Sequence, residues 1–574
     1  MNSYSSDTRE RRVERQLVEG QSDGRLSADE RAGESELAGC GSELAGRYAP
    51  AGIRARTERS RHLHQSPSYQ AEDGHWYRNA DDALGHCGET LTWDEVAVFS
   101  RLAQGFTSGS RSLVRQMKRL PWMSRIDDRG AVQLESIPAH SLRGFTAKEI
   151  ASRMKDLLRE EMREACDGFD EIYLLLTGGL DSRIVALTLR DLHREGVIEN
   201  KPLAVTWGLE DSRDVVYARD LARMLDFPWQ HIELEPRHLL ENIEISACQI
   251  GGLANPVDLH RWSWFKNVSS SSLVLAATSG DSIGRGEAGR ATLLDRQALR
   301  PGTAHGLLRA DVERAGRQGF VNDLNAMEQR IGSRPDYAIN ECLDEGECDH
   351  GCLVPTQAVI DQYCHLYRAF TSPELVSYMW SIHPSLRNDD PYAELLQMLD
   401  PKFAAFPWAR TNRALSGKTV GRRRGLRYDY DQYLDWIGGD LYDELRQRIE
   451  PEWFASTGLF DASGVRRLGD WIKEGGLDLR TAGKRPYWTW LWLAVFRRYA
   501  EHIEELNKSI AADVQPIEAG DDSAARKTAP SAGRVRRFLR QNQFLLDSVR
   551  NIRRRLLRRR ALRDYPISEE KYGE

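Results

Sequence analysis

The segment from Thr177 to Ser182 reads Thr-Gly-Gly-Leu-Asp-Ser, and its residue types suit phosphate binding. Gly178 and Gly179 can adopt backbone angles that bring main-chain N–H groups close to an anion. The two hydroxyl side chains add further donors. Asp181 offers the carboxylate oxygen that a magnesium ion beside bound phosphates prefers. We therefore predict a phosphate-binding loop that also carries a ligand for Mg²⁺.

The residues on either side of this loop predict the elements that position it. Residues 172–176 are an apolar run typical of a parallel strand covered on both faces, and apolar residues recur at helical spacing after Ser182. A helix that begins there directs its unpaired N–H groups at the anion. The alternative is a plain strand-to-helix turn in which Asp181 and Ser182 serve as N-caps. No Lys-Ser or Lys-Thr pair follows the glycines, which excludes the P-loop of kinases and ATPases.

The stretch from Leu176 to Arg183 resembles the pyrophosphate-binding loop, Ser-Gly-Gly-x-Asp-Ser, of the N-type ATP pyrophosphatases. Its Gly-Gly-Leu-Asp-Ser form is most similar to the asparagine synthetase family, with Thr177 in place of the usual serine. The resemblance spans roughly residues 100 to 420 and implies ATP and Mg²⁺ as cofactors. The ATP-binding residues that it implies are Leu175, Thr177, Gly178, Gly179, Leu180, Asp181, Ser182, Val205, Thr206, Ser279 and Gly280.

The same resemblance implies a second loop and a basic segment at the site. The family commonly reads Gly-x-Gly-Gly-Asp-Glu where this chain has Ser279-Gly280-Asp281-Ser282, so one of two adjacent acids is missing. The implied metal ligands are Asp181 and Asp281, and a plain turn is the alternative for the second loop. Arg410 and Lys418 stand where the family holds phosphates late in the reaction, and with Asp181 they complete the implied catalytic set. Ordinary surface basic residues are the alternative reading of Arg410 and Lys418.

Strands and helices alternate after the phosphate loop. Residues 203–208, 231–234 and 272–277 are predicted strands, with a predicted helix between the first two that ends near Leu225. This order predicts an α/β fold with a doubly wound parallel sheet, similar to the adenine nucleotide α-hydrolases, whose ligand lies at the carboxyl ends of the strands. From Glu287 onward the pattern is helical, and the tryptophan-rich residues 484–498 predict a last core helix.

The predicted organisation is a folded core with tails. We expect residues 1–62 to be disordered, 63–145 to form a small mixed domain, 146–505 to form the synthetase domain, 506–533 to be a linker and 534–574 to form a basic amphipathic tail. The resemblance makes 63–145 a glutaminase-like remnant, with a hairpin over residues 127–134. Asn2 follows Met1 where a working glutaminase of this type has a cysteine, so we expect no glutamine hydrolysis.

Composition and cysteine content limit the remaining classes. The 574 residues are 40% hydrophobic with a net charge of −6, which permits a large core and implies no polyanion partner from total charge. No apolar run suggests a membrane span or signal peptide, and the eight cysteines do not suggest a disulfide scaffold, so we expect a cytoplasmic protein. A zinc site among Cys342, Cys348, Cys352, Cys364, His350 and His365 is an alternative to unremarkable cysteines.

A loop that binds pyrophosphate implies attack at the α-phosphorus of ATP. The expected reaction is adenylation of aspartate or another small acid, followed by transfer to ammonia or an amine, with a separate glutaminase as a possible source of ammonia. Another pyrophosphatase of this fold, tRNA-modifying or peptide-cyclising, and a degenerate ATP-binding protein are the alternatives. The basic tail suits an anionic membrane surface, a nucleic acid, an acidic protein or its own domain.

Overall fold

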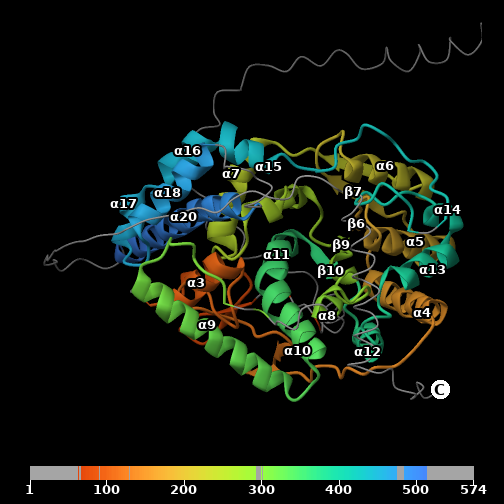
Figure 1. The fold of residues 1–574 in the computed structure, drawn as a ribbon, viewed down its shortest axis with the longest axis horizontal. Coiled ribbons are helices and arrows are strands. Elements are labelled where there is room, and N and C mark those ends of the chain that lie inside the picture. The colour runs from red at the N-terminus through yellow and green to blue at the C-terminus, as the bar shows by residue number, and fades with distance from the viewer. Residues whose placement is uncertain are drawn as a thin grey trace, which may run out of the picture. The chain divides into compact units, whose positions relative to one another are not determined.

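Five short strands form one parallel sheet in the order β10-β9-β6-β7-β8 (Figure 1). Their bounds are β6 Ile172–Leu175, β7 Leu203–Trp207, β8 Trp229–Ile232, β9 Leu273–Ala276 and β10 His365–Arg368. The protein is described here from a computed structural model. The structure describes residues 63, 66, 68–88, 91–127, 129–292, 299, 301–415, 417–474 and 484–512.

The central strand β6 pairs with β9 on one side and β7 on the other, with Tyr173 opposite Val274 and Leu203. The chain crosses from β6 through a helix to β7 and later returns to β9 on the opposite side of β6. The strand order therefore reverses at β6, whose carboxyl end carries the predicted phosphate loop. The predicted α/β class with a parallel sheet is confirmed.

Both faces of the sheet are buried, each against its own core. Leu174 and Leu275 pack in one core, whereas Leu175 and Val274 pack in the other. The first face is covered by α4 Ala147–Cys166, α5 Asp181–Arg194, α6 Arg213–Leu225 and α13 Asp389–Leu399. The second face is covered by α11 Val354–Tyr363 and the short 3₁₀ segments η3 Pro256–Leu259 and η4 Trp262–Asn267. This double burial explains why the strands are continuous apolar runs in the sequence.

Strand β10 corrects the expectation of an entirely helical pattern after Glu287. Residues His365–Arg368 pair in parallel with Leu273–Ala276 and add a fifth strand at the edge of the sheet. The other elements between β9 and the C-terminal helices are helical. They are α8 Glu287–Thr292, α9 Ala310–Ile331, α10 Asp336–Leu343, the π-helical η6 Asp344–Leu353, α12 Pro373–Ser381 and α14 Pro401–Ala404.

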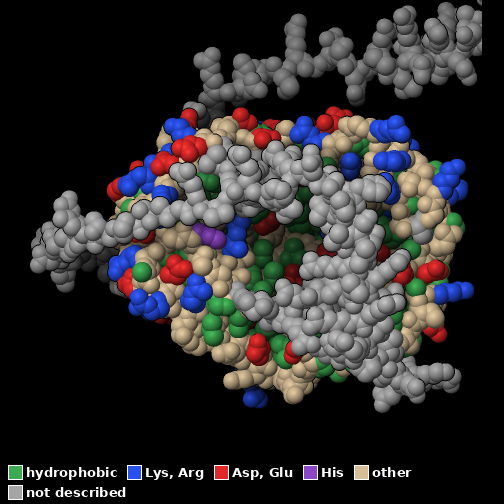
Figure 2. All heavy atoms as spheres, in the orientation of Figure 1, with side chains coloured by type: hydrophobic (Ala, Val, Ile, Leu, Met, Phe, Trp, Pro, Cys, Tyr) green, Lys and Arg blue, Asp and Glu red, His purple; other side chains and the backbone are tan. Residues whose placement is uncertain are grey.

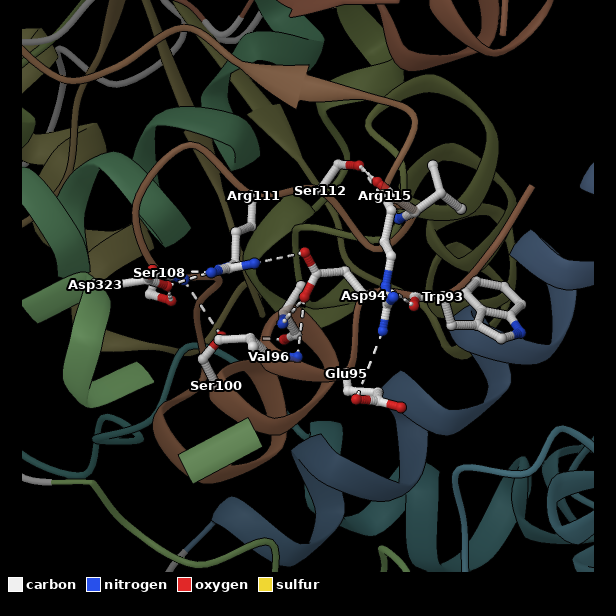
Figure 3. Close-up of polar contacts among 12 residues, drawn as sticks. Trp93, Asp94, Glu95, Val96, Ser100, Ser108, Arg111, Ser112, Arg115 and Asp323 are labelled. Atoms are coloured by element: carbon white, nitrogen blue, oxygen red, sulfur yellow. Dashed lines mark hydrogen bonds and ion pairs between the residues drawn. The ribbon is translucent and has the colours of Figure 1, made fainter. Parts of the chain in front are cut away.

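The segment before α4 is a small mixed structure that packs on α9. Its elements are β1 Tyr69–Gln70, β2 Trp76–Tyr77, α2 Ala80–Leu84, α3 Glu95–Gln104, β3 Lys118–Arg119, β4 Ser124–Ile126 and β5 Val132–Leu134. Strands β4 and β5 pair antiparallel, which confirms the predicted hairpin. Figure 3 shows Arg111 between Asp94, the N-cap of α3, and Asp323 of α9, at 2.8 and 2.7 Å. This ion pair network attaches the segment to α9.

The C-terminal helices lie together and hold the last predicted core element. They are α15 Tyr433–Asp435, α16 Tyr442–Arg448, α17 Pro451–Ser456, α18 Ala462–Lys473 and α20 Arg485–Ala512, and α7 Pro236–Glu244 from the middle of the chain packs against α20 (Figure 1). Trp490 and Trp492 of α20 are buried, as the core assignment predicts. Helix α20 continues to Ala512, past the start of the predicted linker. Along the described stretches of the chain, no helix has the length and apolarity needed to span a membrane.

Some predictions fall on residues outside those that the structure describes. These are the disorder of residues 1–62, most of the linker over 506–533 and the amphipathic tail over 534–574. The division at residue 145 also stays a prediction.

Candidate active site

The phosphate loop between β6 and α5 is held by hydroxyl groups within it. The N–H of Thr177 donates to Ser182 Oγ at 3.2 Å, and the N–H of Gly179 donates to Thr177 Oγ1 at 3.1 Å. The N-cap of α5 is Leu180, which makes no side-chain capping bond. Asp181 and Ser182 are therefore inside the helix, and the alternative in which they serve as its N-caps is wrong.

The close approach of residues 406–413, which follow α14, explains why residue 178 is a glycine. A Cβ at Gly178 would lie 2.7 Å from Ala409 Cβ and 3.2 Å from Tyr217 Cβ. The Gly178 carbonyl instead accepts a hydrogen bond of 3.0 Å from the Ala409 N–H. This hydrogen bond holds residues 406–413 against the phosphate loop.

Arg183 stabilises the contact between the phosphate loop and residues 406–413. Its fully buried guanidinium donates to the carbonyls of Phe403, Phe406, Pro407 and Gly178 at 3.2, 3.0, 2.9 and 3.3 Å. Burial lowers the pKa of Arg183 to about 9, so it remains charged at neutral pH. One arginine therefore connects the predicted phosphate loop with the segment that carries Arg410.

The turn after β9 meets the phosphate loop at Asp181. A Cβ at Gly280 would lie 2.4 Å from Asp181 Oδ1 and 2.6 Å from Asp181 Cβ, so only glycine fits here. Tyr392 of α13 holds the turn in place by donating from its hydroxyl to the Gly280 carbonyl at 2.7 Å. The contact brings together Asp181 and Asp281, the two predicted metal ligands, from separate strand ends.

Burial and neighbouring charges raise the pKa values of these two carboxyl groups. Burial raises the pKa of Asp181 to about 6; Arg285, 3.3 Å away, opposes this increase, and Asp281 adds to it. Burial also raises the pKa of Asp281, and Glu287 adds to that increase. The Ser282 N–H donates to Asp281 Oδ1 at 3.0 Å. Two neighbouring, partly buried carboxylates favour a cation between or beside them.

The residues present fit a magnesium ion that also binds phosphate oxygens. Asp181 Oδ1 is buried and has no hydrogen-bond partner among the described residues. Mg²⁺ commonly takes one or two carboxylates and completes its six ligands with water and substrate phosphates. Within the described ranges, no three His, Cys, Asp or Glu side chains are arranged to hold a metal. Asp181 and Asp281 would therefore hold the ion only together with ATP.

The remaining predicted ATP-binding side chains are buried beneath the loops. Val205 and Leu175 pack in the core of the second sheet face, Leu180 packs in the first, and Ser279 is fully buried. Thr206 donates from its hydroxyl to the Leu176 carbonyl at 2.7 Å. Contact with ATP at Val205 or Thr206 would therefore come from main-chain atoms, and it stays a prediction.

Arg410 and Lys418 differ in how near the site they lie. Arg410 Nη1 is 3.7 Å from Glu287 Oε1, and its guanidinium carbon is 5.6 Å from the centre of the Trp408 ring. Lys418 is exposed, and no ion pair joins its ammonium to a described carboxylate. Arg410 is thus at the edge of the site, while the phosphate-holding role of both residues stays a prediction.

Three acidic residues of η6 lie close enough to Asp281 to interact with it electrostatically. Burial raises the pKa of Asp344 to about 6, and burial together with neighbouring acids raises the pKa values of Glu345 and Asp349. Asp281 adds to all three increases. Figure 2 shows this face of the molecule hollowed over α11, the helix after η6, with hydrophobic and acidic side chains in the hollow.

The cysteines of this region are not a metal site in the structure. Cys342, Cys348, Cys352 and Cys364 are free thiols, and burial raises the pKa of each. No metal-binding group includes them within the residues that are described. They pack in, or against, the hydrophobic cores, as expected for cysteines without a metal-binding role.

Sequence reasoning missed the two buried arginines of the site. Arg183 and Arg285 are each at most 5% exposed and contact the phosphate loop directly. Arg183 follows the loop immediately, and Arg285 stands between two glycines after the second loop. The position of Arg285 between two glycines was the only local sign in the sequence that this arginine belongs to the site.

Comparison with known proteins agrees with this geometry. The family model described as asparagine synthase matches residues 153–363. The match begins in α4, includes both loops and η6, and ends at the last residue of α11. No curated protein matches the chain. Residues 153–363 therefore resemble the synthetase domain of the asparagine synthase family, and this match supports an ATP-dependent amide ligase.

Proposed function

We propose that this protein is an AMP-forming ligase. It adenylates the carboxylate of aspartate or another small acid, releases pyrophosphate, and transfers the acyl group to ammonia or an amine. The observation that carries the proposal is the contact between Gly280 and Asp181, which joins the phosphate loop to the turn bearing Asp281. A loop of this kind suits pyrophosphate as leaving group rather than transfer of the terminal phosphate.

The residues at the strand ends have separate roles in this reaction. The N terminus of α5 and the loop amides would bind the phosphate oxygens. Asp181 and Asp281 would hold Mg²⁺, which neutralises charge on the phosphates as the bond to the α-phosphorus breaks. Donors that are already fixed, such as these amides, stabilise developing charge without further reorganisation.

The acids of η6 support a nitrogen nucleophile as the second substrate. An amine reaches the site largely as its ammonium ion, and Asp344, Glu345 and Asp349 offer negative charge near Asp281. A carboxylate with a raised pKa is also suited to accept the proton that the amine loses when it attacks. Free ammonia, a separate glutaminase and a substrate amine remain the candidate nitrogen sources, and the cytoplasmic location stays a prediction.

Product analysis tests the proposal. The full chain is incubated with ATP, Mg²⁺, ammonium and a panel of small acids that begins with aspartate, and AMP with pyrophosphate is scored against ADP with phosphate. We expect acid-dependent AMP and pyrophosphate, which Asp181→Ala abolishes. Asp191→Ala on the same helix, where the Asp191 carboxylate pairs with Arg190 at 2.9 Å, is the control and should retain turnover. ADP and phosphate as products would refute an AMP-forming mechanism, and nucleotide binding without turnover would favour a degenerate binding protein.

A further inference from the structure

The turn after β9 is built around the side chain of Arg285. A Cβ at Gly284 would lie 2.2 Å from the hydroxyl of Tyr392, and Gly286 has a φ of 54° with Arg387 only 3.1 Å from its Cβ position. Neither position accepts a larger residue without movement. The side chain between these glycines is 5% exposed and is directed to the phosphate loop, where Nη2 lies 3.3 Å from Asp181 Oδ2.

Two aromatic rings and three carboxylates surround the guanidinium. Its central carbon lies 5.5 Å from the ring centres of both Tyr392 and Trp408. Besides Asp181, Nη1 has Glu287 at 3.4 Å and Asp389 at 3.6 Å. Burial favours the neutral form, but Asp181, Asp281 and Glu287 keep the pKa of Arg285 above its ordinary value. The group is therefore a permanent cation in a fixed position.

The hydrogen-bonding capacity of this guanidinium is little used. An arginine has five N–H donors, and the distances to its carboxylates, from 3.3 to 3.6 Å, exceed the 2.7–2.9 Å usual for charge-assisted bonds. Arg285 Nε is buried and has no hydrogen-bond partner among the described residues. Buried donors are rarely left unsatisfied unless a ligand completes them. The planar fork of an arginine matches phosphate oxygens particularly well.

We propose that Arg285 binds the pyrophosphate portion of ATP and remains bound to the leaving pyrophosphate. This inference rests on the proposed function, because it gives Arg285 a substrate in the same site. The cation comes three residues after Ser282, which stands where the family commonly has a second acid. Arg285 thus supplies from the protein part of the positive charge that metal ions at two acids would otherwise provide. Because it is positioned before ATP arrives, it stabilises the charge that develops on the leaving group.

Binding of inorganic pyrophosphate to the full chain tests this role without requiring turnover. Calorimetric titrations with Mg²⁺ present compare the wild type with Arg285→Met and Arg285→Lys. We expect Arg285→Met to weaken pyrophosphate binding about 10- to 100-fold, as the loss of hydrogen bonds to a charged group does. Lysine keeps the charge but lacks the fork, so Arg285→Lys should lose about 3- to 10-fold. Adenosine binding should change less than twofold in both variants.

Arg190→Met is the matched control. Arg190 has a similarly buried side chain, 6% exposed, an ion pair with Asp400 at 2.7 Å and an aromatic neighbour in Phe403. It should lower stability as Arg285→Met does but leave pyrophosphate affinity within twofold. Circular dichroism verifies that each variant is folded.

Two results overturn the inference: wild-type protein that does not bind pyrophosphate, or folded Arg285 variants that bind it as the wild type does. If Arg285→Met does not fold, Arg285→Lys decides the question by the same criterion. Failure of the proposed function is a separate result. In that case no acid supports AMP formation, while pyrophosphate binding still depends on Arg285.

Discussion

Gly280→Ala perturbs the close contact between the turn after β9 and the phosphate loop. The added methyl would lie 2.4 Å from Asp181 Oδ1, whereas ordinary contacts of a Cβ begin at 3.4 Å, so one side must move by about 1 Å. The turn is restrained by the hydrogen bond from Tyr392, and Asp181 is restrained by its place in the first turn of α5. We expect the Asp181 carboxylate to rotate away from Asp281, because a side chain moves more easily than either backbone.

A displacement of this size has a predictable cost. Misplacement of a catalytic group by about 1 Å lowers the rate roughly 100-fold, and overpacking of a buried site costs about 1–3 kcal/mol of stability. We therefore expect the rate constant for AMP formation to fall about 100-fold while the protein remains folded. Steady-state release of pyrophosphate measures the rate, and urea unfolding measures the stability.

Gly439→Ala provides the control for adding a methyl group. No atom lies within 4 Å of a Cβ at Gly439, and its φ is not in the left-handed region. This variant should keep wild-type turnover and stability. Normal turnover by a folded Gly280→Ala protein would refute the argument that the position of Asp181 depends on the turn after β9.

Three further changes test the electrostatics and the anchoring of the site. Burial raises the pKa of Asp181 from 3.8 to about 6, so its contribution to stability is complete only below pH 3.8 and is lost as pH rises through 6. The shift corresponds to about 3 kcal/mol, most of which is lost between pH 4.5 and pH 8, so the stability of Asp181→Asn relative to wild type should rise by about 2 kcal/mol over that interval. An equal difference in urea unfolding at both pH values would contradict this. Arg183→Met removes hydrogen bonds to four carbonyls and should lower the free energy of unfolding in urea by about 2–4 kcal/mol. It should also raise the KM for ATP. An unchanged KM would show that the segment carrying Arg410 is positioned by other contacts. Asp323→Ala removes one of the two described ion pairs of Arg111 and should lower the stability measured by thermal unfolding by about 1–3 kcal/mol without changing ATP turnover. A loss of turnover in folded protein would link this N-terminal anchor to the site.

The sequence was informative wherever burial and local geometry act in the same direction. Strands β6, β7 and β9 are apolar because both faces of the sheet are covered, and α4 combines helical spacing with a Thr146 and Glu149 capping box. Strand β10 lacks these signals. It has four residues with His365 and Arg368 at its ends, follows α11 after a single residue, and becomes a strand only because the edge of β9 is open to it.

The site residues likewise divide into those that have a local sequence signal and those that have none. Thr177 to Ser182 is one continuous stretch whose chemistry can be recognised locally, and Asp281 was found because the Ser279-Gly280-Asp281 turn after a predicted strand resembles the second loop of the family. Arg285 and its partner Asp389 lie far apart in the sequence, and nothing local distinguishes a buried arginine from the many exposed ones. Burial and pairing are tertiary properties, so these residues required the structure.

The charges of the site indicate how ligand binding and stability are connected. Asp181, Asp281 and the acids of η6 have raised pKa values because burial disfavours their ionised forms. Arg285 offsets part of this negative charge, through contacts of 3.3 Å or longer. A site that holds excess buried negative charge is less stable empty than when a cation binds, because ligands specific for the folded state stabilise it by mass action. The same carboxylates that lower the stability of the free protein at neutral pH would therefore give the site its affinity for Mg²⁺ with ATP and for an ammonium substrate.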